Sequence, residues 1–361
     1  MFCERTTVGL DVHARSVVAE AIDWRTGQVF SRRLVPEHEV VLAWVGSLPG
    51  PVAVTYEAGP TGFGLARAFA AAGIRCEVIA PSKLERPPGD RVKTDRRDAR
   101  RMARLLHIGE ITGIRVPTVA EEDARDLFRA RDAARVEVMR ARHRCSKLLL
   151  RHGIVYSGGK TWNGVHERWL RGQRFALPGT AAAFDAAFDA VLSTTSRRDR
   201  LDTAITLTAA RPEWAPMVAR LGAIRGIATL TGFGLAVEIG DWDRFTGASI
   251  GAYLGLVPSE SSSGTSRHQG SITKTGNTHA RRLLVEAAWH HQRLLRPASK
   301  AVAARRALLS PARRARGQAA DQRLYHRWTT MAARKKEPSV IAVAVARELA
   351  GWCWSLATMK D

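Results

Sequence analysis

The chain has 361 residues, enough for two or three domains, and its hydrophobic content of 45% excludes a disordered tail. Its formal net charge is +22 and its pI is near 11.1. An excess this large repels itself in a compact fold, so it indicates a polyanionic partner. Nucleic acid is favoured, because each neutralised phosphate releases condensed counterions. Arginine-rich composition bias explains part of the excess, but not why acidic residues fail to balance it.

Two other classes of protein are disfavoured. No apolar run reaches the roughly eighteen residues of a membrane-spanning helix. The nearest, 340–356, contains Arg347 and Glu348 and predicts an amphipathic packed helix. The chain begins directly with a strand-like segment, without the pattern of a signal peptide. The four cysteines form no C-x-x-C pair, so neither a disulfide framework nor a zinc site is indicated. We therefore expect a reduced, cytoplasmic protein that does not associate with membranes.

The first third of the chain alternates between strand and helix patterns. Residues 6–34 contain the strand-like segments TVGLDVH, SVVAEAID and QVFSRRL, with a glycine-containing hairpin turn before the third. There follow a helix near 37–48, a strand VAVTYE ending at Glu57, a helix near 62–72, a strand CEVIA and a helix beginning near Thr94. This order predicts an α/β domain with helices on the faces of a mixed sheet, the plan of an RNase H-like (RuvC-like) domain.

The rest of the chain is predicted to be mainly helical. A long charged pattern over 120–152 predicts an extended helix or coiled-coil arm, and a second helical run covers 181–210 after a Gly, Trp and Arg interruption. Glycine then recurs every few residues, followed by the Ser/Gly-rich stretch VPSESSSGTSRHQGSITKTGN and by helices from Thr278 onward. We divide the chain into a metal-binding catalytic domain, a helical arm and a mainly α C-terminal domain, at 1–115, 116–212 and 213–361.

Four acidic residues in the first domain predict a metal centre. Asp11 lies in GLDVHA, where a buried strand should carry an apolar residue, and an unpaired buried carboxylate is costly. Glu57 ends the fourth strand, which neighbours the first in an RNase H-like sheet. Asp95 and Asp98 in KTDRRDA share one face of a helix. Four converging carboxylates would repel each other unless divalent cations lay between them. We expect Mg²⁺, in two ions, with Mn²⁺ able to substitute.

Each of these features is weak by itself. For Asp95 and Asp98 the alternative is a solvated helix face that pairs with Arg96, Arg97 and Arg100. Only the combination of acids, in this order along the chain, favours the metal centre.

A serine cluster marks the C-terminal domain. Residues 261–264 alone are typical of a flexible linker. Their flanks are not, because Arg267, Lys274 and a helix N-terminus capped by Asn277 would offer positive charge and N–H groups to a phosphate. A serine hydroxyl needs an activating group. No Ser-His-Asp pattern is visible, and His268 is better explained as a phosphate or structural contact, so the metal centre is the candidate activator.

Basic and aromatic residues also gather in GGKTWNG and RWLRGQRF, in the middle of the chain. Lys160, Trp162 and Arg171 are candidate contacts to RNA or DNA, the tryptophan by stacking on a base. Packing inside the protein is the alternative role for the aromatic ring.

Taken together, GLDVHA, YEAGPTG, KTDRRDA, LGLVPSESSSG and ITKTGN resemble the DEDD transposases of insertion sequence 110 elements, which include the Piv-type DNA invertases. The resemblance covers nearly the whole chain and implies a RuvC-like domain, a helical arm and a C-terminal transposase domain. It places the family's nucleophilic serine on Ser263, with Ser262 as the alternative register. Its four acids fall on Asp11, Glu57, Asp95 and Asp98.

The resemblance further implies a DNA recombinase that cuts and rejoins donor and target double-stranded DNA through a phosphoserine intermediate. It implies guidance by an element-encoded non-coding bridge RNA, dimers that assemble to tetramers with a shared active site, and a bacterial, nucleoid-associated location. The segment 221–241 resembles a helix-hairpin-helix, but Ala228 and Thr229 stand where a second glycine is expected. The sequence leaves transposase and invertase open.

Two other functions remain as alternatives. An actin-like or sugar-kinase-like ATPase would need a second, related half with its own Gly-rich phosphate loop, and no repeat of the first pattern follows Ala210. A non-catalytic nucleic-acid-binding protein with an RNase H-like fold would not need the four acids and the serine, which are all present.

Overall fold

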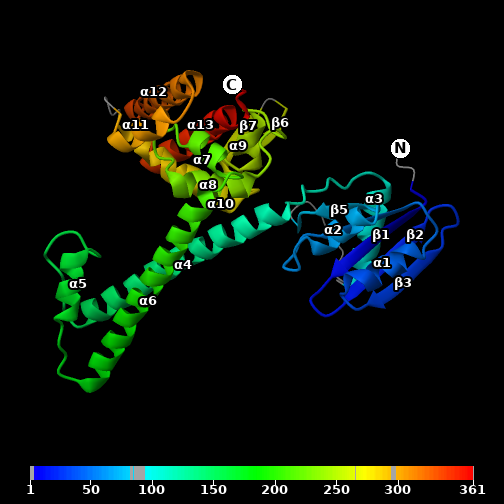
Figure 1. Cartoon of the computed structure of the whole chain (residues 1–361), viewed down its shortest axis with the longest axis horizontal. Coiled ribbons are helices and arrows are strands. Elements are labelled where there is room, and N and C mark those ends of the chain that lie inside the picture. Colours follow the sequence, from blue (N-terminus) through cyan, green and yellow to red (C-terminus); the bar gives the residue numbers. More distant parts are fainter. Residues whose placement is uncertain (1–3, 82–83, 85–93, 265, 294–297, 361) are drawn as a thin grey trace. The chain divides into compact units, whose positions relative to one another are not determined.

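The computed structural model describes residues 4–81, 84, 94–264, 266–293 and 298–360. The chain forms two compact units, Met1–Thr118 and Val119–Asp361, and each is described by itself. Figure 1 shows a sheet with flanking helices in the first unit, whereas the second unit is mainly helical.

A five-stranded sheet organises the N-terminal unit. Its strands are β1 (Thr6–Val12), β2 (Val17–Asp23), β3 (Val29–Leu34), β4 (Val52–Glu57) and β5 (Arg75–Ile79), in the spatial order β3-β2-β1-β4-β5. The first three strands form the predicted antiparallel meander, and Gly27 supplies the positive φ of 76° in the β2–β3 turn. β4 and β5 run parallel to β1. The mixed α/β sheet expected from the sequence is therefore confirmed.

Helices cover both faces of this sheet. On one face, Val8, Leu10 and Tyr56 pack with α1 (His38–Gly46) and α2 (Gly64–Ala71) in one apolar core. Side chains alternate along a strand, so the neighbouring residues of β1 point to the opposite face. α3 (Asp95–His107) covers that second face and begins, as predicted, after Thr94, whose hydroxyl accepts a hydrogen bond from the Arg97 amide.

Two long helices begin the C-terminal unit. α4 (Val119–Arg151) and α6 (Pro178–Ala209) pack along each other (Figure 1). In the sequence, α5 (Gly164–Arg171) lies between these two helices. The sequence pattern predicts only an interruption of the helical run at this place. Asn163 caps α5 by accepting a hydrogen bond from the His166 amide, and Leu170 is buried in a small apolar core that includes Phe184. An Asn before a short helical stretch was the available sign of this helix.

The remaining elements enclose a large apolar core. They are α7 (Ala215–Leu221), α8 (Thr229–Ile239), α9 (Ser249–Tyr253), β6 (Pro258–Ser263), β7 (Ser266–Ile272), α10 (Thr278–Ala288), η2 (Trp289–Gln292), α11 (Lys300–Ala307), α12 (Pro311–Ala333) and α13 (Pro338–Thr358). The Ser/Gly-rich stretch is not an irregular linker, because β6 and β7 pair as an antiparallel hairpin. Gly264, with a φ of 57°, permits the tight reversal after β6.

Within the part of the chain that the structure describes, one helix, α13, is long and apolar enough to cross a membrane by length and composition alone. Half of its most apolar window is buried, and Ile341, Val345, Leu349 and Cys353 belong to the core of the C-terminal unit. α13 is thus a packed core helix, as the sequence predicts. Among the described residues, Cys76, Cys145 and Cys353 are free thiols, and Cys3 lies outside them.

Candidate metal centre and serine hairpin

The sheet places Asp11 and Glu57 on adjacent strands. Leu10 on β1 pairs with Tyr56 on β4 in parallel register. Asp11 and Glu57, the next residue on each strand, therefore lie at the same level of the sheet. Leu10 and Tyr56 are fully buried on one face, and Asp11 and Glu57 therefore belong to the other face. Asp11 is partly buried and Glu57 is exposed. The predicted adjacency of the first and fourth strands is confirmed.

The first turn of α3 lies against this same face. A Cβ atom added to Gly9 would collide with the carbonyl oxygen of Ala99, so β1 and α3 approach as closely as their backbones allow. Two residues earlier on β1, the Thr7 hydroxyl donates to the Ala103 carbonyl over 2.8 Å. This tight packing brings Asp95, at the start of α3, to the end of β1.

His13 completes a group of three potential ligands. Its Nε2 lies 3.3 Å from Oδ1 of Asp11 and 3.7 Å from Oδ2 of Asp95. One ligand atom from each of the three residues lies within 4.8 Å of the others. The sequence analysis did not identify His13. The available sign was its position, because His13 directly follows β1 and lies two residues after Asp11 in the sequence.

The electrostatics of this group fit a cation. Burial raises the pKa of Asp11 above its ordinary value, and the neighbouring charges of Asp95 and Asp98 raise it further, while His13 lowers it. Repulsion between carboxylates held this close is relieved when a divalent ion binds among them. The two carboxylates are the oxygen donors that Mg²⁺ and Mn²⁺ prefer, whereas the imidazole nitrogen of His13 is a donor more typical of softer divalent metals.

Two of the three arginines that the alternative interpretation placed on Asp95 and Asp98, Arg96 and Arg100, instead bind an acid of the sheet. Arg96 donates to Oε1 of Glu20 over 2.8 Å, and Arg100 donates to Oε2 over 2.9 Å. Glu20 lies on β2 and is fully buried. Both cations are thus used to fasten α3 to the sheet, which leaves Asp95 facing His13.

The structure therefore brings together some of the four predicted acids more closely than others. Asp11 and Asp95 share the three-residue group with His13. Asp98 acts on Asp11 through its charge. Glu57 follows the register of β4 to the same face but is not part of the close group.

In the C-terminal unit, the two candidate serines differ in their surroundings. Ser262 donates its hydroxyl hydrogen to Oε1 of Glu260 over 2.9 Å. Ser263 lies next to Gly264 at the end of β6, and within the described residues its hydroxyl makes no hydrogen bond. Both side chains are exposed. The hydroxyl of Ser263 is the one left available for chemistry.

The predicted phosphate contacts near the hairpin have partners within the chain. Arg267 donates to Oε2 of Glu260 over 2.9 Å, and this bond is the main reason that the pKa of Glu260 lies below its ordinary value. Asn277 caps α10, as predicted, by accepting from the Ala280 amide, and its amide nitrogen donates to Glu238 over 2.7 Å. The role of Asn277 shown here is therefore structural.

Lys274, the third predicted phosphate contact, adopts a φ of 55°, and its backbone amide donates to the Gly255 carbonyl over 3.1 Å.

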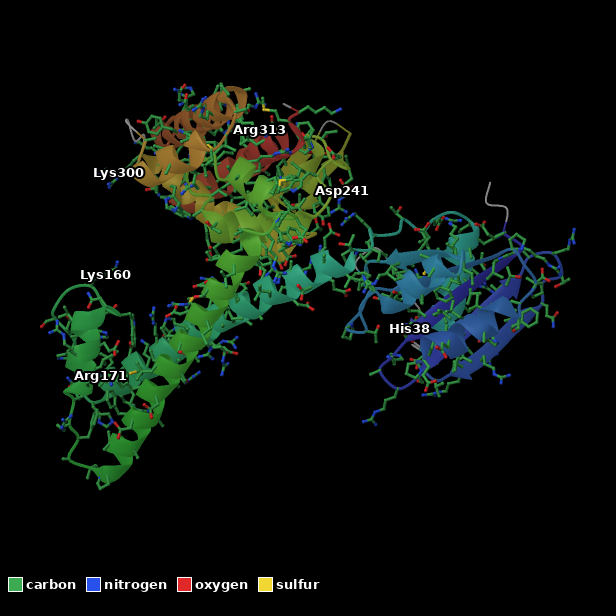
Figure 2. The ribbon with its side chains drawn as sticks, viewed as in Figure 1. His38, Lys160, Arg171, Asp241, Lys300 and Arg313 are labelled. Atoms are coloured by element: carbon green, nitrogen blue, oxygen red, sulfur yellow. The ribbon has the colours of Figure 1, made fainter. Side chains whose placement is uncertain are left out.

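In the middle of the chain, Figure 2 labels Lys160 and Arg171 in the segment around α5. Arg171 pairs with Glu167 over 2.7 Å, whereas Lys160 is exposed. Trp162 stands in the same segment beneath the guanidinium of Arg142.

Comparisons with known proteins identify the family of the chain. Residues 8–154 match the DEDD transposase family of IS110 elements, and residues 218–304 match the family described as Transposase IS116/IS110/IS902. The chain is 39% identical over 306 residues to transposase y4qE of Sinorhizobium fredii, covering 84% of this chain and 74% of the relative. It is 28% identical over 342 residues to the transposase for insertion sequence element IS1533 of Leptospira borgpetersenii, covering 91% and 97%.

These matches include both sites, since one family match spans the acids of β1, β4 and α3 and the other spans the serine hairpin. The chain belongs to the IS110 family of DEDD transposases. It is a DNA transposase, an enzyme that cleaves and rejoins DNA.

Proposed function

We propose that the chain cuts and rejoins donor and target DNA with Mg²⁺ held by Asp11, Asp95 and His13, and with Asp98 and Glu57 beside them. The observation that carries this proposal is the convergence of an imidazole and two carboxylates from separate segments within 4.8 Å. The N-terminal sheet would then be an RNase H-like fold, whose neighbouring first and fourth strands both end in acids.

When bound, Mg²⁺ would supply positive charge that lowers the pKa of an attacking hydroxyl and stabilises the leaving oxygen. The residues of the chain do the positioning. Glu20 and Gly9 fix α3 against β1, so that Asp95 meets Asp11. Burial is the main cause of the raised pKa of Asp11, and the negative charges of Asp95 and Asp98 add to it, so a cation bound beside these carboxylates would stabilise the ionised form of Asp11.

We assign the covalent step to Ser263. Its Oγ would form a bond to a backbone phosphorus, a phosphorus–oxygen bond of the DNA would break, and the serine proton would leave to a base. The freed deoxyribose oxygen takes up a proton. In the rejoining step a deoxyribose hydroxyl would attack the phosphoserine phosphorus and lose its proton to a base, the P–Oγ bond would break, and the serine oxygen would take up a proton to restore the Ser263 hydroxyl. Ser262 stays the alternative nucleophile, because its hydroxyl donates to Glu260, a carboxylate able to accept its proton.

The wider assembly is proposed from family membership. A non-coding bridge RNA would select donor and target, α4 and α6 would act as a coiled-coil arm between subunits, and dimers would assemble to tetramers. In this arrangement the acids and the serine that act on one phosphate come from different copies of the chain.

A strand-cleavage assay on labelled element-end DNA tests the chemistry. Wild-type protein should cleave with Mg²⁺ and stop in EDTA, and Asp11→Asn and Asp98→Asn should be inactive, while the exposed-site control Glu39→Gln should cleave normally. Mixing Asp11→Asn with Ser263→Ala protein should restore part of the activity if the site is shared between copies. Undiminished cleavage in EDTA contradicts the proposal.

A further inference from the structure

A pocket between α4, α5 and α6 has no role in the function proposed above. Its volume is about 580 Å³, and it lies entirely within the helical part of the C-terminal unit. Its lining combines cationic, aromatic and hydroxyl side chains, among them Arg142, Trp162, His166, Phe188, Thr195 and Arg198.

Two buried polar atoms of this lining lack a hydrogen-bond partner among the described residues, namely Nε of Arg142 and Oγ1 of Thr195. Buried polar groups are nearly always paired, so two unpaired atoms that line one pocket are a place where water or a bound ligand can supply the hydrogen bonds. Both residues face one pocket, which makes a single ligand able to satisfy them.

Arg142 also differs from its charged neighbours. Arg198 pairs with Asp199, and Glu167 pairs with Arg171, so these charges are already balanced. Within the described part of the chain, no carboxylate lies at ion-pair distance from Arg142. Burial lowers the pKa of Arg142 and Arg198 adds to the effect, while the charge of Asp199 opposes it, so an anion bound at Arg142 would further stabilise its charged form.

The aromatic side of the pocket is held in a strained conformation. Trp162 has a φ of 62°, a left-handed value that is unfavourable for a bulky side chain. Its amide donates to Nδ1 of His166 over 3.1 Å, and the adjacent Asn163 caps α5, so the ring is fixed beside the pocket. The guanidinium of Arg142 lies 5.1 Å from the centre of this ring.

We propose that this pocket binds one unpaired nucleotide of a nucleic acid, with the base against Trp162 and a phosphate at Arg142. An aromatic ring and an arginine are the side chains that stack on unpaired bases, and arginine also pairs with phosphate. The pocket has room for one nucleotide, whereas a base pair in a duplex is stacked on both sides and has no free base to insert. A free RNA strand and a displaced DNA strand share this chemistry.

The test measures binding of full-length protein to labelled single-stranded RNA, single-stranded DNA and duplex DNA of one sequence. All proteins carry Asp11→Asn, so that strand cleavage does not enter and failure here is separable from failure of the metal centre. Arg142→Met and Trp162→Leu should each weaken single-strand binding about ten-fold or more and leave duplex binding unchanged. Trp162→Phe should recover most of the loss, and Arg140→Met, an exposed arginine of the same helix, serves as the matched control.

A second readout does not depend on affinity. RNA or DNA containing 5-bromouridine or 5-bromodeoxyuridine should photo-crosslink to a peptide containing Trp162, and the strand that crosslinks more efficiently identifies the source of the nucleotide. The proposal is overturned if Arg142→Met and Trp162→Leu, with thermal unfolding like that of the control, bind single strands as the control does. It is equally overturned if crosslinks form only elsewhere.

Discussion

Gly9 on β1 and Ala99 on α3 touch backbone to backbone, and no side chain larger than hydrogen fits between them. This contact sets the distance between the sheet and the helix that carries Asp95 and Asp98. Gly9 lies two residues before Asp11, so a displacement of α3 would change the distance between Asp95 and Asp11.

Replacing Gly9 with alanine should therefore push α3 away from β1. We expect a loss of stability of about 1–3 kcal/mol, as in other overpacked cores, together with a loss of Mg²⁺-dependent cleavage. Urea unfolding and the cleavage assay measure the two effects. Gly46→Ala is the matched control, because an added Cβ there meets no atom within 4 Å. Equal stability of the two variants would show that the Gly9 contact is not tight.

The buried Glu20 carboxylate should position α3, and with it Asp95, although Glu20 is not itself a member of the acidic group. Glu20→Gln removes the negative charge shared by Arg96 and Arg100 and turns one of the two acceptor oxygens into an NH₂ donor that faces an arginine, so we expect about 1–3 kcal/mol of destabilisation. Cleavage should fall by about ten-fold or more, because α3 is no longer held in register. Glu39→Gln, an exposed acid on α1, should change neither quantity. Normal cleavage by Glu20→Gln would remove the positioning role assigned to this residue.

The two serines of the hairpin should separate cleanly in a covalent-trapping experiment. With labelled DNA carrying a nick that prevents rejoining, wild-type protein and Ser262→Ala should give a protein–DNA adduct on denaturing gels. Ser263→Ala should give none, while still binding DNA, because its hydroxyl forms the bond to phosphorus. An adduct that persists in Ser263→Ala and disappears in Ser262→Ala would transfer the nucleophile to Ser262.

The stability of the C-terminal unit should depend on pH through His291. Burial, with added repulsion from Arg225, lowers the pKa of this fully buried ring to about 3, against 6.5 in an unfolded chain. Between these values the unfolded state binds the extra proton, so stability falls as pH drops from about 6.5 toward 4.5, at up to about 1.4 kcal/mol per pH unit. Urea unfolding followed by tryptophan fluorescence measures the slope.

His291→Leu should flatten that slope, whereas His290→Gln, which alters the exposed neighbouring ring, should keep it. Carboxylates begin to titrate at the lower end of this window, and burial raises the pKa of Asp321, so the contribution of His291 is the difference in slope between the variants. A slope that is identical in all three proteins would contradict the assignment to His291.

The sequence predicts the N-terminal unit well for a physical reason. Alternating strands and a parallel β4 make Asp11 and Glu57 neighbours in any sheet of this order, so their adjacency followed from topology alone. His13 was missed because one histidine near a strand end is common, and only the approach of Asp95 gives it meaning. Glu20 was also missed, since nothing in SVVAEAID shows that two arginines some 76 and 80 residues later will reach it.

The C-terminal unit was harder to predict, because two of its elements depend on contacts between segments that are far apart in the sequence. The composition of β6, with three consecutive serines, is typical of a linker, and the hairpin forms because β7 supplies cross-strand partners such as Arg267 for Glu260. The short helix α5 is fixed by its Asn163 cap and by packing against α4 and α6. Both features depend on tertiary partners that local patterns do not contain.

The most direct test of the central claim is calorimetric titration of Mn²⁺ and Mg²⁺ into the full-length protein without nucleic acid. Wild-type protein and the Glu39→Gln control should bind the ions saturably, and Asp11→Asn and Asp95→Asn should each weaken binding by at least about ten-fold, as expected when a ligand of the ion is lost. Equal affinity in all four proteins would contradict a metal centre built on Asp11 and Asp95.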